Sequence, residues 1–213
     1  MKHIGDNIMA VSSLSRMTVP LASDQSQSTQ GLLMPKLKYR FRVIFENFGI
    51  STPRTELTKQ VMDFKRPTVS FANIDLPIYN STIKLAGKYT WEDVTCQLRD
   101  DAGGQVSRLV GEQLQKQLDF MEQASAASGI DYKFLTRFEV LDGGNGTAQP
   151  IALETWELYG CYLQSVNYND ANYGTSEPMT VSMTIRFDNA LQTPTGSGVG
   201  ATVGRTVGDV VNG

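Results

Sequence analysis

Few side chains in this chain could carry out acid–base or nucleophilic chemistry. Histidine is the usual general acid or base near neutral pH, and the 213 residues include one, His3. A single histidine also excludes a multi-histidine zinc site. The adjacent carboxylates Glu92 and Asp93 fall in a predicted strand, where neighbouring side chains point to opposite faces. We therefore expect no catalytic site, no metal site and no cofactor.

A glycine-rich stretch at residues 196–204 resembles a phosphate-binding loop only superficially. A dinucleotide-binding loop needs a strand before it, a helix after it and an acidic residue further on, and the chain ends at Gly213. The Gly-Lys-Ser/Thr sequence of the other common nucleotide-binding loop is missing. We expect no nucleotide site here.

The two cysteines, Cys96 and Cys161, have neither metal-ligand nor redox-motif spacing. Each falls in a predicted strand, which favours a small, buried and reduced side chain. A disulfide within the chain or a bridge between subunits remains an alternative.

Composition excludes several broad classes. The net charge of −3 argues against a general nucleic-acid binder, which carries a basic excess for phosphates. No run approaches the roughly 18 apolar residues of a membrane span, and the first residues lack the apolar core of a signal peptide. We expect synthesis in the cytoplasm and no membrane insertion.

Alternating apolar and polar residues predict a mainly β protein. The first predicted strand, residues 36–45, carries Lys36, Lys38, Arg40 and Arg42 on one face. These cations fit either the solvated face of an edge strand or a face that meets a partner. Further strands are predicted at 61–65, 74–79, 82–86, 91–99, 132–141, 151–166 and 179–187, with a turn near Gly87 and a bend at Gly160.

One long helix is predicted at about residues 104–128. Apolar residues recur there at spacings of three and four, which is typical of a helix packed on a sheet; they are Val106, Leu109, Val110, Leu114, Leu118 and Met121. Asp100 and Asp101 precede the helix, where carboxylates cap free N–H groups, and Gly129 would end it.

Three segments follow from this pattern. Residues 1–35 are rich in Ser, Gln and Thr but keep scattered apolar residues, so we predict an arm that orders against a neighbouring subunit. Residues 36–190 form the β domain, and residues 191–213 a Gly/Val-rich tail.

Charge is unevenly distributed along the chain. Residues 36–88 hold ten Lys/Arg and four acidic residues, whereas residues 139–188 hold one Arg and seven acidic residues. This asymmetry favours contacts between the basic patch of one copy and the acidic patch of the next. The candidate inter-subunit residues on this basis are Lys36, Lys38, Arg40, Arg42, Glu154, Glu157 and Asp170.

The ordered set of these elements resembles the tail-tube proteins of contractile-tailed bacteriophages and the related tubes of type VI secretion systems. The resemblance rests on the first strand, the segment 67–77, the strand pair at 81–87 and 89–98, and the acidic pair before the helix. It also rests on the turn at 158–163 and on a final strand that ends near Asp188. It covers residues 36–188.

The resemblance implies a small β-barrel or sandwich flanked by one helix. It implies hexameric rings that share an inner β-barrel and stack head to tail inside a contractile sheath. Such a tube conducts DNA, meets baseplate, terminator and tape measure proteins, and is part of the virion, after assembly in the host cytoplasm. The connection after the first strand often joins rings in this family, which adds Pro53 and Leu57 to the candidates. The resemblance therefore implies a structural protein and not an enzyme.

Two other readings stay open at this point. A tube initiator or terminator of the same fold would stop at one ring. A monomeric β-rich binding module would need a concave pocket with convergent polar groups, which no sequence feature demands.

Overall fold

The computed structural model describes residues 36–50, 55–142 and 150–193. The chain divides into two compact units, Met1–Tyr39 and Arg40–Gly213. In the first unit the described residues are 36–39, which include a turn at Lys38 and Tyr39. The predicted arm at 1–35, the candidate Pro53 and the tail from residue 194 onward lie outside the described residues.

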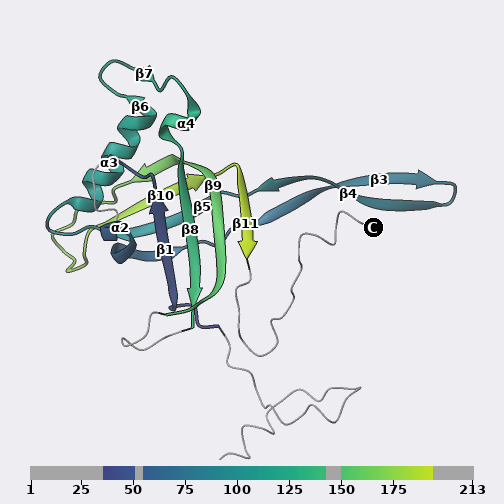
Figure 1. Cartoon of the computed structure of the whole chain (residues 1–213), viewed down its shortest axis with the longest axis horizontal. Coiled ribbons are helices and arrows are strands. Elements are labelled where there is room, and N and C mark those ends of the chain that lie inside the picture. The colour runs from purple at the N-terminus through teal and green to yellow at the C-terminus, as the bar shows by residue number, and fades with distance from the viewer. Residues whose placement is uncertain (1–35, 51–54, 143–149, 194–213) are drawn as a thin grey trace, which may run out of the picture. The chain divides into compact units, whose positions relative to one another are not determined.

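The second unit is mainly β (Figure 1). Its helices are α2 (Thr55–Gln60), α3 (Gln105–Gln117) and α4 (Gly129–Tyr132). Its strands are β1 (Phe41–Glu46), β2 (Val61–Phe64), β3 (Val69–Ile78), β4 (Ser81–Trp91), β5 (Val94–Arg99), β6 (Leu118–Asp119), β7 (Ala124–Ser125), β8 (Phe134–Leu141), β9 (Ala152–Asn167), β10 (Thr180–Arg186) and β11 (Asn189–Thr193).

Seven strands form the main sheet, in the order β1-β8-β9-β10-β5-β2, with β11 paired to β9. The long strand β9 takes part in both halves of this sheet. Its residues 152–161 pair with β8 and β11, and together with β1 these form half-sheet A. Its residues 162–167 pair with β10, which continues through β5 to β2 as half-sheet B. Figure 1 shows β9 curving over as it passes from one half to the other.

The change of direction in β9 occurs at Gly160. This glycine has φ +66°, a left-handed conformation that residues with a Cβ rarely adopt. A Cβ there would lie 2.7 Å from Cγ of Asp188 and closer still to its Oδ2. The bend that the sequence predicted at this glycine is therefore confirmed, and its cause is both the backbone conformation and the approach of Asp188.

We expect Gly160→Ala to lower the free energy of unfolding by about 1–3 kcal/mol, since it adds backbone strain and displaces Asp188. Chemical denaturation would measure the loss. Gly111→Ala is the matched control, because a Cβ at this position in α3 meets no atom within 4 Å. That change should stabilise the protein by roughly 0.5–1 kcal/mol. Equal effects of the two substitutions would contradict a special role for Gly160.

One apolar core joins the two half-sheets and α3. The buried residues of α3 include Val106, Leu109 and Val110, as the apolar stripe predicted. Asp101 Oδ1 accepts hydrogen bonds from the N–H groups of Gln105 (2.9 Å) and Val106 (3.5 Å). The predicted acidic cap is therefore confirmed for Asp101, whereas the Asp100 carboxylate accepts from the Asp101 N–H (3.0 Å) and the Ser107 hydroxyl.

The predicted end of the helix is wrong. α3 stops at Gln117, and Leu118 is already extended, with φ −152° and ψ 127°. Asp119 turns the chain, because its Oδ1 accepts hydrogen bonds from the N–H groups of Met121 (2.9 Å) and Glu122 (3.3 Å). Gly129 does not end a helix but begins α4, which Ser128 caps with its side chain.

Four other predictions need correction. The first strand begins at Phe41, so Lys36 and Lys38 are not part of β1. Gly87 lies inside β4, opposite a shift of register in β3, and the turn is at Tyr79-Asn80. The segment after β1 contains the short helix α2, which places Leu57 in the core. Finally, β11 occupies 189–193, where the tail was expected to begin.

Candidate assembly surfaces

Half-sheet B has two unlike free edges. Over the described residues the sheet path ends at β2 on one side. On the other side, residues 164–167 of β9 pair with β10 alone among the described strands. At Leu163 this second edge is closed by Gln117, whose side-chain amide donates to the Leu163 carbonyl (2.9 Å) and accepts from its N–H (2.8 Å). An exposed strand edge is a template for pairing with another chain.

The strand directions of half-sheet B allow it to continue from copy to copy. The three pairs β2–β5, β5–β10 and β10–β9 are all antiparallel. Four alternating strands leave β9 running opposite to β2. In a ring, rotation preserves strand direction about the axis, so β9 of one copy would meet β2 of the next in antiparallel orientation. Such a contact between unlike surfaces generates rings.

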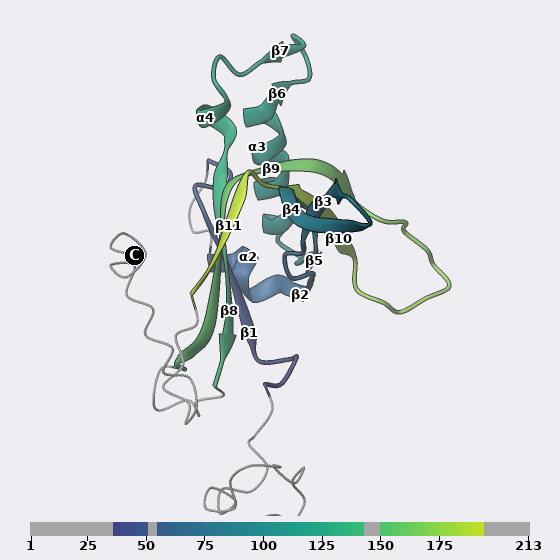
Figure 2. The same cartoon turned by 90° about the vertical axis from the view of Figure 1, so that its right-hand side faces the viewer.

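The β3–β4 hairpin is a separate two-stranded sheet that runs beyond the other strands (Figure 1) and points toward the viewer in Figure 2. Along β3 every second residue from Ile74 to Ile78 is aliphatic, and aliphatic residues of β4 lie opposite two of them. One face of the outer hairpin is therefore aliphatic, made of Ile74, Leu76, Ile78, Ile83 and Leu85, which are each between 43% and 51% exposed. We call these five residues the aliphatic face.

The other face of the outer hairpin is polar. Lys84 lies opposite Asp75 in the register, and their side chains form an ion pair of 3.2 Å. Nearer its base this same face becomes aromatic. Phe71 contacts Tyr89, Tyr89 contacts Trp91, and Trp91 contacts the core residue Phe187, through tilted or edge-on rings whose centroids are 5.6–6.4 Å apart. The base of the hairpin is thus anchored on the core, while the aliphatic face has no cover in the described chain.

Ion pairs cover the outer face of half-sheet A. Arg42 pairs with Glu139 across β1 and β8 at 2.5 Å. Arg137 bridges Glu46 (3.1 Å) and Glu157 (3.0 Å), so that charges on three neighbouring strands meet. Arg42, from the basic stretch 36–88, therefore pairs with Glu139, from the acidic stretch 139–188, inside one molecule.

The structure gives several predicted inter-subunit residues partners in the same chain. Arg40 donates to the carbonyl of Asp142 (2.8 Å). Glu154 is 5% exposed and accepts hydrogen bonds from Trp156 Nε1 (2.7 Å) and Gln192 Nε2 (2.8 Å). Asp170 lies in the exposed loop 168–179, and Lys36 and Lys38 are exposed in the first unit.

Leu57 is fully buried within the subunit, and its predicted contact with another ring stays a prediction. Electrostatic attraction between subunits stays a prediction. Assembly measured at low and high salt would check it.

Glu157 has a pKa below its usual value because it accepts a hydrogen bond from the Tyr159 hydroxyl (2.6 Å) and pairs with Arg137. A lowered pKa in the folded state adds stability above the unfolded pKa, and this stability is lost as pH falls. We expect Glu157→Gln to cost up to about 1 kcal/mol at pH 7. The difference from wild type should shrink below roughly pH 5.

Urea denaturation of the Glu157→Gln variant and of wild type, at pH 7 and in the acid range, would measure the loss of stability at pH 7 and its decrease at low pH. Glu177→Gln, in the exposed loop 168–179, is the matched control and should behave like wild type. A Glu157→Gln effect that does not change with pH would contradict the ionic contribution.

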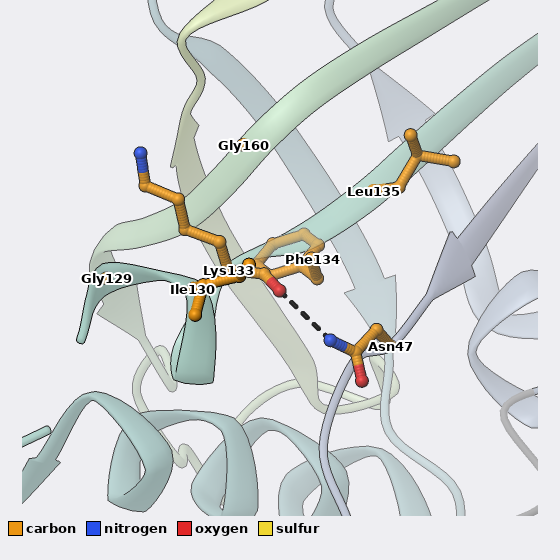
Figure 3. Close-up of a pocket in the computed structure, with 7 residues that line it drawn as sticks. All are labelled: Asn47, Gly129, Ile130, Lys133, Phe134, Leu135 and Gly160. Atoms are coloured by element: carbon orange, nitrogen blue, oxygen red, sulfur yellow. Dashed lines mark hydrogen bonds between the residues drawn. The ribbon is translucent and has the colours of Figure 1, made fainter. Parts of the chain in front are cut away.

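A hollow of about 500 Å³ opens beside α4 (Figure 3). Its lining includes Ile130, Phe134 and Leu135, with Asn47 Nδ2 donating to the backbone oxygen of Lys133 (3.1 Å). The Lys133 ammonium contacts Asp188 (2.6 Å), and this hydrogen bond raises the pKa of Lys133. The hollow lacks several polar side chains converging on one point, which a specific small-molecule site needs.

Both cysteines are free thiols in the core. Burial raises the pKa of Cys96, and it raises the pKa of Cys161 to about 11. The predicted burial of both side chains is thus confirmed. Among residues 36–50, 55–142 and 150–193 no group of three or more His, Cys, Asp or Glu could hold a metal ion. No helix within those ranges is long and apolar enough to cross a membrane.

Sequence reasoning did not find the aliphatic face. The alternation predicted two strands, at 74–79 and 82–86, and the structure has the longer strands β3 and β4 there, with β3 ending at Ile78. The sequence did contain a signal for this face. In a hairpin with its turn at Tyr79-Asn80, Ile74 lies opposite Leu85 and Leu76 lies opposite Ile83, so the aliphatic residues of both strands share one face. Alternation of this kind normally marks a face turned toward the chain's own core, and here that core does not cover it.

Comparison with known proteins gives the class of fold. No family model and no curated protein match the sequence. A sheath/tube terminator of an extracellular contractile injection system (PVC) in its extended state matches with a TM-score of 0.56 and 12% identity, over 76% of this chain and 99% of that chain. The tube-terminating cap of the anti-feeding prophage (AFP) matches with a TM-score of 0.54 and 12% identity, over 77% and 94%.

A chain of the PVC sheath–tube complex in its extended state matches with a TM-score of 0.52 and 12% identity, over 87% of this chain and 98% of that chain. At this identity the likeness is one of fold. The fold is that of the tube, terminator and cap proteins of contractile injection systems. The resemblance to tail-tube proteins inferred from the sequence is thus confirmed at the level of fold.

Proposed function

We propose that this protein is a structural subunit of the tail tube of a contractile-tailed phage, and not an enzyme. Its copies form hexameric rings that stack inside a contractile sheath and conduct DNA. The observation that carries the proposal is half-sheet B, an antiparallel four-stranded sheet with an unlike free edge on each side. Pairing of these edges between copies closes a barrel and leaves no strand edge exposed.

The aliphatic face of the β3–β4 hairpin supports stacking. A two-stranded hairpin of this length is marginally stable in water by itself, and it gains stability when its apolar face is covered. A neighbouring copy provides that cover in a tube. The sheath, baseplate, terminator and tape measure proteins are the other proposed partners, and the virion tail is the proposed location, reached after assembly in the host cytoplasm.

Negative-stain electron microscopy of the purified, untagged protein over a range of concentrations tests the proposal. Hollow tubes of uniform width are the expected result. Hydrogen exchange adds a local test, since peptides that contain β2 and residues 164–167 should exchange more slowly in the tube than in the free subunit. Monomers at every concentration, including in the presence of a preformed tube end, would contradict the proposal.

A terminator ring is the second candidate, favoured by the similarity to the PVC terminator and to the AFP cap. A terminator uses the same ring contacts but presents one stacking surface. Microscopy separates the two roles, because a terminator should stop at single rings at concentrations where a tube subunit grows. Both roles need the same pairing of strand edges between copies.

A further inference from the structure

The side chain of Gln117 closes one end of the free edge of β9. On this edge β8 pairs with β9 as far as Cys161. Two residues further along, the Gln117 amide donates to the Leu163 carbonyl (2.9 Å) and accepts from the Leu163 N–H (2.8 Å). A side chain from the end of α3 therefore takes the place of the next residue of a paired strand. Beyond it, residues 164–167 pair with β10 alone among the described strands.

Val166 presents its backbone groups to the part of this edge that Gln117 leaves open. Successive residues of a strand point their N–H and C=O groups alternately to its two neighbours. Leu163 lies opposite Ile185 of β10, and its own groups point the other way, to Gln117. Because a bulge follows in β9, the next residue in the equivalent position is Val166, opposite Met183. The side chains of Leu163 and Val166 both pack on the core.

On the free edge of β2 two residues match Val166. The Lys65 N–H donates to the Thr95 carbonyl of β5 (2.8 Å), so the backbone groups of the preceding residue, Phe64, point to the free edge. Val61 is in the equivalent position three residues earlier, because β2 also contains a bulge, and both side chains pack on the core. Apolar residues of paired strands must share one face, so Val166 of one copy fits opposite either Phe64 or Val61 of the next.

Gln117 distinguishes these two registers. If Val166 lay opposite Val61, the antiparallel strand would bring Phe64 opposite Leu163, because both bulged strands count three residues between equivalent positions. The backbone groups of Leu163 are already bound to Gln117, so those of Phe64 would meet no partner. If Val166 lies opposite Phe64, β2 ends there and places no strand residue opposite Leu163. The second register alone is compatible with the bound Gln117.

We propose that Gln117 fixes the register in which two copies pair, with Val166 of one copy opposite Phe64 of the next. This inference rests on the proposed function. A shift of one residue would turn the apolar residues of β2 to the wrong face of the sheet. The shift that keeps the faces matched, with Val61 opposite Val166, is the one that Gln117 blocks; we call it the slipped register. A single register gives every copy the same contact, which a closed ring of identical copies requires.

Disulfide cross-linking of assembled tubes with diamide reads the register directly. In the proposed register Ser165 lies opposite Lys65 of the next copy, both exposed, in a pair whose Cα atoms are about 4.5 Å apart. A disulfide spans this distance. Within one chain the same positions are three strand spacings apart, about 14 Å, which a disulfide cannot span. Oxidised Ser165→Cys/Lys65→Cys tubes should therefore yield covalent oligomers. The native thiols Cys96 and Cys161 are at most 1% exposed and add little background.

The variant Ser165→Cys/Met62→Cys reports the slipped register, in which Met62 lies opposite Ser165. In the proposed register Met62 is three residues, about 10 Å, from that position. In tubes confirmed by microscopy, the pair 165–65 should give at least tenfold more cross-linked protein than the pair 165–62. Asn167→Cys/Asp63→Cys is a second variant for the proposed register. More cross-linking through residue 62, or none through residues 65 and 63, would overturn the inference while the tube itself stands.

Gln117→Met tests the role of the side chain itself. Methionine keeps the length of the side chain and suits a helix, but it frees both backbone groups of Leu163. In this background cross-linking between residues 165 and 62 should rise at least fivefold. Gln115→Met, at an exposed position of the same helix, is the matched control and should leave the pattern unchanged. An unchanged pattern in Gln117→Met tubes would contradict the inference. Failure of the wild-type protein to form any tube or ring would instead contradict the proposed function.

Discussion

The double variant Leu76→Glu/Ile83→Lys should fold normally and fail to form tubes. Leu76 and Ile83 lie opposite each other in the hairpin and are 43% and 47% exposed. Their replacement leaves the core untouched. A Glu–Lys pair at these positions stabilises the same register, as Asp75 and Lys84 do on the polar face. The hairpin should therefore persist with a charged face in place of an aliphatic one.

The size of the effect follows from the area that assembly covers. Burying the exposed halves of two aliphatic side chains contributes about 2 kcal/mol, and covering a charged pair adds a desolvation cost. The critical concentration for tube growth should rise by about 30-fold or more. Sedimentation and negative-stain microscopy measure it, while thermal unfolding of the unassembled subunit checks the fold.

The swapped variant Asp75→Lys/Lys84→Asp is the matched control. It lies at adjacent register positions, keeps the net charge and conserves the ion pair on the polar face. Its tubes should form at nearly the wild-type concentration. Equal growth of the Leu76→Glu/Ile83→Lys variant and wild type would show that the aliphatic face is not part of the assembly contact.

The elements that the sequence predicted well are those whose apolar residues pack against the core of the same chain. Strands near 61–65, 132–141, 151–166 and 179–187 are present because their alternating apolar residues face the chain's own core. The start of α3 was predictable because Asp101 and the apolar stripe act locally.

The errors arise where the apolar spacing or the alternation in the sequence continues past the end of the helix or strand that it predicts. Leu118 and Met121 extend the helical spacing, yet the carboxylate of Asp119 binds the N–H groups of the following turn and ends the helix. The alternation of cations at 36–42 likewise extends past the strand, which begins at Phe41.

The candidate surfaces were harder to predict because their partners are distant in sequence. Arg42 and Glu139 are separated by 97 positions, so their spacing gives no sign of an ion pair. Leu57 is apolar and falls in a segment without clear periodicity, so the sequence could not show that it is buried. Which side chains share a face of half-sheet B depends on the register of three strands, which only the fold specifies.

Gln113→Leu should be among the most destabilising single substitutions in this protein. Gln113 is a fully buried side chain of α3. Its Oε1 accepts a hydrogen bond from the N–H of Gly49 (2.9 Å), and its Nε2 donates one to the carbonyl of Tyr132 (2.7 Å). The side-chain amide of Gln113 thus connects both the turn after β1 and the end of α4 to α3 by hydrogen bonds.

Leucine fills a similar volume but leaves both backbone groups without a partner. Each unpaired group costs about 1–3 kcal/mol, so the free energy of unfolding should fall by about 2–4 kcal/mol. The midpoint of thermal unfolding should drop by roughly 5–15 °C for a domain of this size. Gln115→Leu is the matched control, because Gln115 is an exposed residue of the same helix and should cost little.

Gln113→Glu separates loss of the hydrogen bonds from loss of packing. A carboxylate at this position still accepts from Gly49 but cannot donate to the Tyr132 carbonyl, whereas a protonated carboxyl can do both. Burial raises the pKa of such a group, so this variant should be destabilised at pH 7. Relative to wild type it should recover as the pH falls below the pKa of the buried carboxyl. The Gln113→Leu variant has no titratable group at the site and should show no such recovery. A similar response of both variants to pH would mean that Gln113 stabilises the fold through its shape rather than through its two hydrogen bonds.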